Sequence, residues 1–193
     1  MLNKQIYSVI AIVLTFIAFY PYIKLIIRGV VHPYVFSWII WSSTTLVVFL
    51  AQLEEGGGVG AWPIGVSACI TLLIAYLSYL KCKNISITRM DWLFFISAMS
   101  SLPFWYFTSD PLWAVVVLTI VDVLGFGPTY RKAYAFPHAE SVVFYSIFGV
   151  RNILVIMALE NYSMTTVLFP AAIGCMSVIL AAVIYQRRVI SLT

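Results

Sequence analysis

Seven apolar runs dominate this sequence, and only short polar segments separate them. The runs cover 6–27, 34–53, 60–80, 92–107, 111–130, 141–159 and 165–185. A helix needs about 20 mostly apolar residues to cross the hydrocarbon core of a bilayer. Seven such helices use most of the 193 residues, which leaves too few for a folded domain outside the membrane. The sequence therefore predicts an all-α polytopic membrane protein with seven transmembrane helices.

Composition limits the class of protein further. Of the residues, 63% are hydrophobic and 9% are charged, whereas soluble domains carry about 25% charged residues. A water-soluble fold is therefore excluded, and the lipid bilayer is the expected environment. The formal net charge of +4 relates first to membrane topology, so no nucleic acid partner is expected. The three cysteines form no CxxC pair, and no metal site is predicted.

Basic residues lie almost entirely on one side of the seven runs. Lys4 lies on the opposite side from the other loop and tail bases, which are Lys24, Arg28, Lys81, Lys83, Arg89, Arg131, Lys132, Arg187 and Arg188. By the positive-inside rule, the N-terminus is expected outside and the C-terminus in the cytoplasm. The compact loops favour the inner membrane of a bacterium as the location.

An internal repeat relates the first three runs to the last three. One constant offset, applied without a gap, places residues of like type in register: Pro21 on Pro128, Lys24 on Arg131, Pro63 on Pro170 and Lys81 on Arg188. We refer to it as the repeat offset. Both copies begin on the same side of the membrane, because a single fourth helix separates them. The expected architecture is two parallel three-helix bundles, 1–83 and 111–193, joined by a linker helix in 84–110.

Pro21 and Pro128 occupy equivalent places near the cytoplasmic ends of the first and fifth helices. Proline removes a backbone donor and disfavours helical geometry in the residue before it. We therefore expect kinks at both positions, which would suit hinges for gating. The alternative is that the two prolines only shape helix packing.

The segments around these prolines resemble those of a known family. Tyr20-Pro21-Tyr22-Ile23-Lys24 and Gly127-Pro128-Thr129-Tyr130-Arg131 each end a helix and precede a short turn and an aromatic-rich helix. In this the chain resembles the SWEET and PQ-loop (MtN3-like) superfamily of small seven-helix transporters, with Pro-Tyr and Pro-Thr where PQ-loop proteins have Pro-Gln. The resemblance implies a transporter fold for sugars, vitamins or amino acids. It also admits cargo receptors of the same fold.

The second and sixth runs carry matching patterns of aromatic and polar residues. In the second run, Trp38, Trp41 and Thr45 share one helix face with Ser42. Their equivalents under the repeat offset are Tyr145, Phe148 and Asn152, with Gly149 in the small position. Aromatic faces stack on planar or sugar-like ligands, and amides and hydroxyls orient them. These six residues are candidates for substrate binding. The alternative is an aromatic stripe that packs helices or lies at the lipid interface.

Two charged residues lie in the middle of apolar runs. Asp122 is in the fifth run and Arg151 in the sixth, where a charge costs about 2.5 to 3.5 kcal/mol on insertion scales. Their equivalents in the first copy are Thr15 and Thr44, so the duplication itself does not require charge. Three roles are open: an Asp122–Arg151 ion pair, binding of an anionic substrate group by Arg151, and proton exchange at Asp122.

Other polar residues at the ends of the runs have simpler expected roles. Glu140 precedes the sixth run, where a carboxylate suits a helix N-terminus, and we expect it to cap that helix. His32 and His138 lie near the cytoplasmic edge and far in sequence from carboxylates, so they are not expected to bind metal.

Several function classes lack the residues they need. The last run has no lysine for a retinal Schiff base, and the chain has no H-E-x-x-H, G-x-S-x-G or nucleotide-binding motif. An enzyme is therefore not expected, and neither is a cofactor. The sequence favours a secondary transporter or facilitator that moves a small polar solute by alternating access of two three-helix bundles, with proton coupling as one form of it. The alternative is a non-transporting membrane receptor or partner subunit. Seven helices suffice as a monomer, and a homo-oligomer is equally compatible with the sequence.

Overall fold

The computed structural model describes residues 2–29, 35–81 and 89–190. Within these ranges the chain is helical, and the helices agree with the seven apolar runs to within a few residues at most ends. The long helices are α1 (Leu2–Ile27), α2 (Val35–Glu54), α3 (Trp62–Lys81), α4 (Arg89–Thr108), α5 (Pro111–Ala135), α6 (Val142–Ala158) and α7 (Met164–Ile190). Two short 3₁₀ helices, η1 (Gly58–Gly60) and η2 (Pro137–Ala139), precede α3 and α6.

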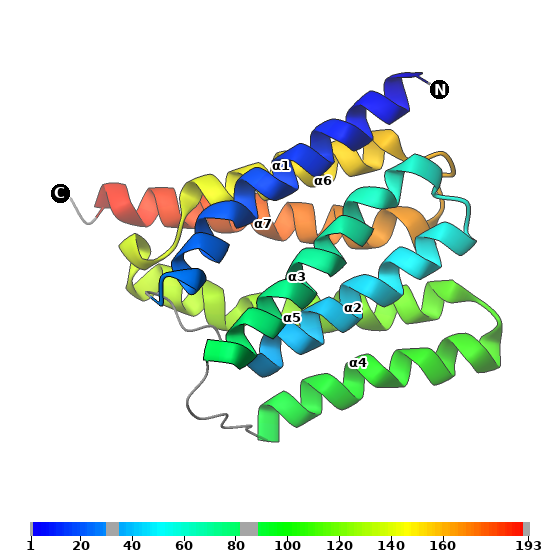
Figure 1. Cartoon of the computed structure of the whole chain (residues 1–193), viewed down its shortest axis with the longest axis horizontal. Coiled ribbons are helices and arrows are strands. Elements are labelled where there is room, and N and C mark those ends of the chain that lie inside the picture. The colour runs from blue at the N-terminus through cyan, green and yellow to red at the C-terminus, as the bar shows by residue number, and fades with distance from the viewer. Residues whose placement is uncertain (1, 30–34, 82–88, 191–193) are drawn as a thin grey trace.

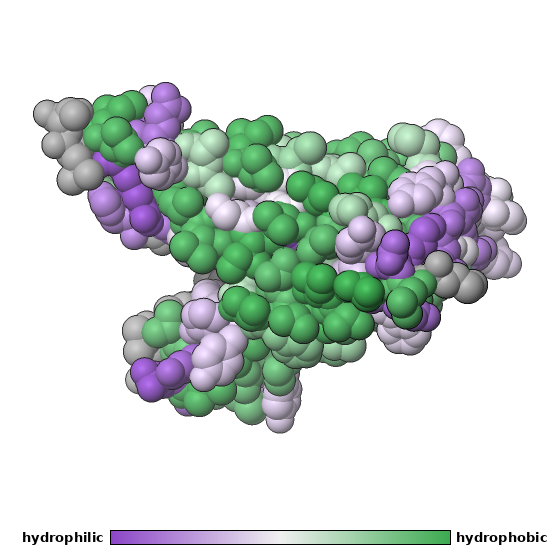
Figure 2. Space-filling model, turned by 90° about the horizontal axis from the view of Figure 1, so that it is seen from above, coloured by the Kyte–Doolittle hydropathy of each residue, from purple (hydrophilic) through white to green (hydrophobic). Residues whose placement is uncertain are grey.

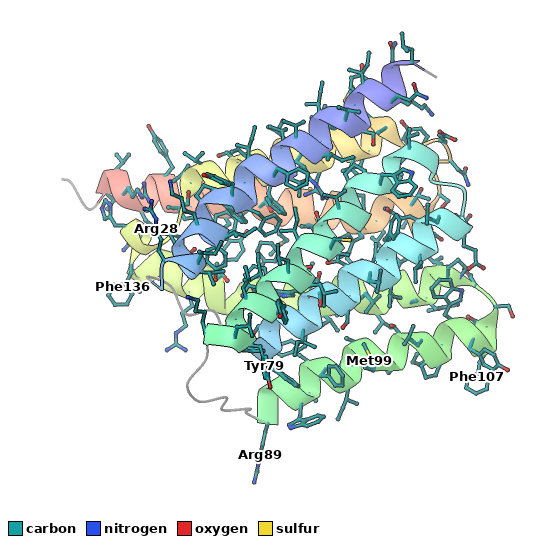
Figure 3. All side chains as sticks on the ribbon, in the orientation of Figure 1. Arg28, Tyr79, Arg89, Met99, Phe107 and Phe136 are labelled. Atoms are coloured by element: carbon teal, nitrogen blue, oxygen red, sulfur yellow. The ribbon has the colours of Figure 1, made fainter. Side chains whose placement is uncertain are left out.

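Successive helices run in opposite directions, so the two chain ends lie at opposite ends of the bundle (Figure 1). This alternation brings the basic residues of separate loops to one end. Arg28 after α1 and Arg89 at the start of α4 lie toward the end where α7 finishes, and Phe107 at the end of α4 lies at the other (Figure 3). We refer to these as the basic end and the opposite end.

Most of the helices are suited in length and composition to a bilayer. Five of those described, α1, α2, α3 with η1, α5 and α7, are long and apolar enough to cross a membrane. The sixth, α6, is apolar but has 17 residues, which correspond to about 25 Å at 1.5 Å per residue. The surface shows the same division, with apolar residues over the middle of the molecule and hydrophilic residues at its two ends (Figure 2). The length and composition of these helices therefore indicate an integral membrane protein.

Helix contacts follow one pattern in the first three helices and in the last three. Helix α3 packs against both α1 and α2, and α7 packs against both α5 and α6. Under the repeat offset, each of these interfaces in the first group has its counterpart in the second. Two further interfaces join the groups, one between α1 and α6 and the other between α2 and α5. Helix α4 packs mainly on α5 and to a lesser degree on α2.

The start of α6 differs from the sequence prediction. Ser141 is the N-cap residue, and its side chain accepts a hydrogen bond from the backbone N–H of Phe144 at 3.2 Å. The prediction that Glu140 caps this helix is wrong. Instead, a Glu140 carboxylate oxygen accepts a hydrogen bond from the hydroxyl of Tyr145 at 3.2 Å. Serine takes the cap because its short side chain reaches the exposed N–H groups of the first turn.

Candidate functional site

Arg151 lies at the place where α6 meets α1 and α3, and its side chain is only 2% exposed. Its Nε donates to Thr15 Oγ1 on α1 at 3.2 Å, and Nη1 donates to Asn152 Oδ1 at 3.1 Å. On α3, Nη2 donates to Ser67 Oγ at 2.7 Å and to the carbonyl of Pro63. A guanidinium has five N–H donors, so four neutral acceptors satisfy most of them. The positive charge thus has hydrogen bonds but no carboxylate among these partners.

Asp122 lies on α5 and is also buried. The side chain of Thr44 on α2 lies beside its carboxyl group. The carboxylate oxygen Oδ1 has no hydrogen-bond partner in the part of the chain that the structure describes, and neither has the buried hydroxyl of Thr119, one helical turn earlier. In this conformation, Asp122 and Arg151 form no ion pair with each other. The interpretation of the two charges as a structural ion pair is therefore not supported.

The two charged residues occupy equivalent interfaces of the repeat. Arg151 contacts Thr15 across the interface of α1 with α6, and Asp122 contacts Thr44 across the interface of α5 with α2. The repeat offset converts Thr15 to Asp122 and Thr44 to Arg151. Each charged residue therefore contacts the threonine that is equivalent to the other charged residue. This arrangement places the two charges in different interfaces and explains why they do not pair.

Aromatic side chains of α2 and α6 gather near these interfaces, together with two from α1. The ring centroids of Trp38 and Trp41 are 5.1 Å apart. The centroids of Phe144 and Phe148 are 4.8 Å apart with the rings stacked. Phe19 on α1 joins the two pairs, at 6.4 Å from Trp38 and 5.4 Å from Phe148. The second α1 residue, Tyr22, packs on Trp38. We refer to these six residues as the aromatic cluster.

The aromatic cluster adjoins the buried arginine. The guanidinium carbon of Arg151 lies 5.7 Å from the centroid of the Phe148 ring, within the range of a cation–π interaction. Trp41 also lies close to α5, because a methyl group added at Gly125 would meet the Trp41 Nε1 at 3.7 Å. The cluster therefore lies between the interface that holds Arg151 and the helix that holds Asp122.

The remaining predicted binding residues lie beside the cluster or at its edge. Thr45 Oγ1 donates to the carbonyl of Trp41 at 2.7 Å, and Asn152 Nδ2 donates to the carbonyl of Phe148 at 2.8 Å. Tyr145 meets the ring of Phe144 edge-on at 5.2 Å and also packs against α7.

The structure thus brings three of the six candidates, Trp38, Trp41 and Phe148, into one cluster. Asn152 adjoins this cluster through its bond to Arg151, and Tyr145 reaches only its edge. The hydroxyl of Thr45 is bonded within its own helix.

The predicted hinge positions lie within continuous helices. Pro21 is exposed in α1, which continues six residues further to Ile27. Helix α5 likewise continues past position 128 to Ala135; the side chain of Pro128 lies outside the described residues. Neither proline ends its helix, so the proposal that they act as hinges concerns bending within a helix.

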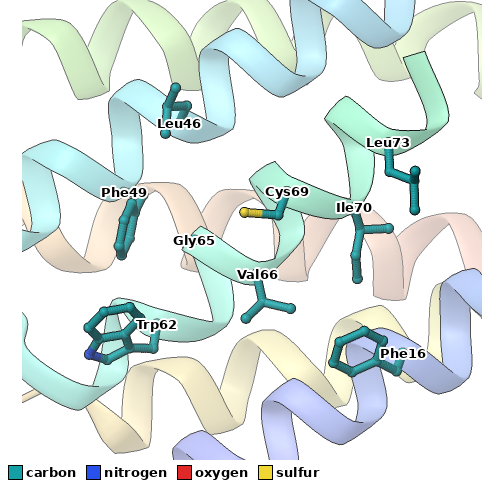
Figure 4. Close-up of a pocket in the computed structure, with 9 residues that line it drawn as sticks. All are labelled: Phe16, Leu46, Phe49, Trp62, Gly65, Val66, Cys69, Ile70 and Leu73. Carbon is teal, nitrogen blue, oxygen red and sulfur yellow. The ribbon is translucent and has the colours of Figure 1, made fainter. Parts of the chain in front are cut away.

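An apolar groove of about 380 Å³ lies on the outer surface of α1, α2 and α3 (Figure 4). Phe16, Phe49, Trp62 and Cys69 are among its lining residues, and none of the predicted binding residues lines it. Phe16 and Trp62 are each 54% exposed, as expected of side chains that face lipid. The groove is therefore unsuited to a small polar solute.

Backbone and side-chain hydrogen bonds join the two groups of helices at the opposite end. There the N–H of Glu160 donates to the carbonyl of Gly57 at 3.1 Å, and Gln52 Nε2 donates to the carbonyl of Thr166 at 2.7 Å. A methyl group at Gly60 would lie 2.5 Å from the backbone nitrogen of Leu159, so the two loops touch through their backbones. Toward the basic end, Lys81 donates to the carbonyl of Ile27 and Arg187 to that of Tyr134, each within one group of helices. The rings of Phe19 and Phe144, with centroids 5.9 Å apart, join the two groups nearer this end.

Comparison of the chain with known protein families, with curated proteins and with solved structures found no match.

Sequence reasoning missed two parts of this site. The acceptors of Arg151 on α1 and α3, which are Thr15, Ser67 and the carbonyl of Pro63, belong to helices far from it in sequence. Phe19 was missed because it lies outside the aromatic pattern of α2 and α6. For Thr15 a signal was present, since it is the repeat equivalent of Asp122, but equivalence does not identify a contact.

Proposed function

We propose that the protein is a seven-helix secondary transporter or facilitator that moves a small polar solute with an anionic group. It works by alternating access of two parallel three-helix halves, α1 to α3 and α5 to α7, joined by α4. The likeness of its proline segments to those of the SWEET and PQ-loop superfamily supports this proposal. So does the equivalence of helix contacts in the two halves.

Arg151 is the observation that carries the proposal. A buried guanidinium is costly in a bilayer and is seldom kept without a role. Here its donors are taken by neutral oxygens, so a solute carboxylate or phosphate would find an uncompensated positive charge. Planar N–H donors match these groups well. The adjacent aromatic cluster would supply flat surfaces for the rest of the solute.

The distribution of contacts supports a conformation closed at the opposite end. Backbone and side-chain hydrogen bonds join the two halves there. Alternating access would break these bonds and close the halves at the basic end. Asp122 lies in the α2–α5 interface, which changes in this movement, and is the residue at which an ion gradient would be coupled. The sequence alone suggests proton exchange as one form of this coupling.

Counterflow in proteoliposomes tests this proposal. Vesicles loaded with unlabelled solute should accumulate the labelled form from outside when the solute is a small carboxylate or phosphate ester. Arg151→Gln should abolish the exchange, because it removes the charge that binds the anion. Arg89→Gln is the matched control, since Arg89 is exposed at the start of α4 (Figure 3). Binding of the solute without exchange would favour the receptor interpretation and reject transport.

A further inference from the structure

The oxygen atoms around Asp122 exceed the hydrogen-bond donors available to them. Both Asp122 Oδ1 and Thr119 Oγ1 are buried and have no partner in the described part of the chain. The Asp122 side chain is 9% exposed and that of Thr119 is 5% exposed. Buried polar atoms without partners are rare in native proteins, and each calls for an explanation such as an unobserved ion or water.

Thr44 cannot remove this excess. Its hydroxyl donates to the carbonyl of Trp41 at 3.0 Å, although it lies beside the Asp122 carboxyl group. A hydroxyl carries one proton, so it serves only one of these two acceptors at a time. The cluster of Asp122, Thr44 and Thr119 therefore presents more oxygen acceptors than it has protons to share among them.

Thr119 also departs from the behaviour of its neighbours. Most buried hydroxyls elsewhere in these helices donate to a carbonyl one turn earlier, as Thr15, Thr71 and Ser177 do. Thr119 makes no such bond. Its oxygen is thus available to another ligand on the face of α5 that also carries Asp122, since residues three apart lie on the same side of a helix.

The spacing favours a metal cation over a proton. Thr119 Oγ1 and Asp122 Oδ1 are not hydrogen-bonded to each other, so a proton on the carboxylate would leave the threonine oxygen unpartnered. Residues at i and i+3 have Cβ atoms about 5 to 6 Å apart. A hard cation of the size of Ca²⁺ or Na⁺ holds oxygen ligands at about 2.3 to 2.6 Å. It can therefore bridge two oxygens up to about 5 Å apart, a separation within reach of two side chains on one helix face.

Charge balance selects a monovalent ion. The charged residues of the packed helices α2, α4 and α7 whose side chains the structure describes lie at helix ends, as Glu54, Arg89 and Arg187 do. Asp122 is therefore the charge that the ion would neutralise. A divalent cation would leave one excess positive charge in the hydrocarbon core, which is strongly unfavourable.

We propose that Asp122 and Thr119 of α5, with Thr44 of α2, form a binding site for one Na⁺ ion. The inference deepens the proposed function and rests on it, because it identifies the ion that would occupy the coupling residue. Closing α2 against α5 would complete the site, and opening that interface would release the ion. Sodium binding would then be linked to the movement of the two halves.

Sodium binding to the purified full-length protein tests this inference without any solute. The probe is Na⁺ itself, measured as bound ²²Na⁺ and as the rise in melting temperature when NaCl replaces choline chloride at constant ionic strength and pH. We expect saturable binding of about one ion per chain and a melting temperature that rises with Na⁺ concentration, as for any ligand bound only by the folded state.

Variants identify the ligands. Asp122→Asn and Thr119→Val should lose ²²Na⁺ binding and the thermal response, whereas Thr119→Ser, which keeps the hydroxyl, should retain both. Thr71→Val is the matched control, because Thr71 is a buried threonine of α3 whose hydroxyl bonds only to its own helix; it should bind Na⁺ as the wild type does. If Asp122→Asn does not fold, the comparison of Thr119→Val with Thr119→Ser still tests the site.

Three results would overturn the sodium site. These are a thermal response no larger in NaCl than in choline chloride, full ²²Na⁺ binding by Thr119→Val, and stabilisation by lower pH alone, which would assign the position to a proton. Failure of the sodium site is separable from failure of the transport proposal. Counterflow without Na⁺ binding would reject only the ion site, and Na⁺ binding without counterflow would reject only transport.

Discussion

Thr15→Val removes one hydrogen bond from Arg151 while keeping the shape of the side chain. Thr15 Oγ1 accepts from Arg151 Nε at 3.2 Å, and both residues are buried, with exposures of 0% and 2%. Because valine accepts no hydrogen bond, a charged N–H would lose its partner away from water. Hydrogen bonds to charged groups contribute about 1.5 to 3 kcal/mol, so we expect a loss of about 2 kcal/mol of folding free energy beyond the loss of the threonine's bond to its own helix.

Thr71→Val provides the reference for that second loss. Thr71 is also buried and donates only to carbonyls of α3, at 2.9 and 3.0 Å, as Thr15 does to Ala11 at 2.8 Å. For a chain of this size, about 1 kcal/mol corresponds to about 2 to 4 °C. Thr15→Val should therefore melt about 4 to 8 °C below Thr71→Val when tryptophan fluorescence is followed in detergent at one heating rate.

A double variant separates the bond from other effects of the substitution. When Arg151 is replaced by methionine, the donor is absent, and Thr15→Val should then cost no more than Thr71→Val in the same background. Equal melting temperatures of the two single variants would refute the reasoning. So would a difference between them that persists after Arg151→Met, because it could not come from the arginine.

Three further predictions concern other parts of the structure. Gly60→Ala should lower stability by about 1 to 3 kcal/mol, since its new methyl group would overlap the backbone of Leu159. Gly127 has open space around it, so Gly127→Ala should leave the melting temperature unchanged or raise it. A similar loss of stability in both variants would contradict the loop contact. Ser141→Ala should lower the free energy of unfolding by about 1 kcal/mol through loss of the α6 N-cap. Ser146→Ala, at an exposed position within α6, should not destabilise the protein. Equal effects of the two substitutions would argue against the cap. Thr15→Asp should be tolerated, because its carboxylate would face the Arg151 guanidinium. Thr45→Asp buries a carboxylate without such a partner, so it should cost about 3 kcal/mol or more in thermal unfolding. Comparable stability of the two variants would show that Arg151 does not act as a charge at this interface.

The helices could be predicted from the sequence because apolar length is a local property. The predicted end of α1 and the predicted start of α5 agree with the structure at Ile27 and Pro111. The α6 cap shows the limit of local reasoning. Glu140 has the favourable charge, but Ser141 is one residue closer and has the side chain that reaches Phe144 N–H. Charge near a helix end is a weaker signal than the geometry of the cap.

The partners of the buried charges could not be predicted in the same way. Asp122 and Arg151 both lie in the middle of apolar runs, and opposite charges suggest a pair. Their separation follows from the packing of α1 against α6 and of α2 against α5, which depends on how three-helix groups dock rather than on any one helix. The repeat offset identified Thr15 and Thr44 as equivalents, yet only the packed structure shows that they are also the contacts.

The distance between the two halves at the opposite end tests the central claim of alternating access most directly. Spin labels attached to cysteines at Glu54 and Tyr162, which are exposed at the end of α2 and in the α6–α7 loop, report this distance after the native cysteines have been replaced. Pulsed electron paramagnetic resonance in lipid should show two distances, a short one for the closed end described here and a longer one for its open form, with their ratio shifted by the solute that supports counterflow. A single short distance that no transported solute alters would contradict the account.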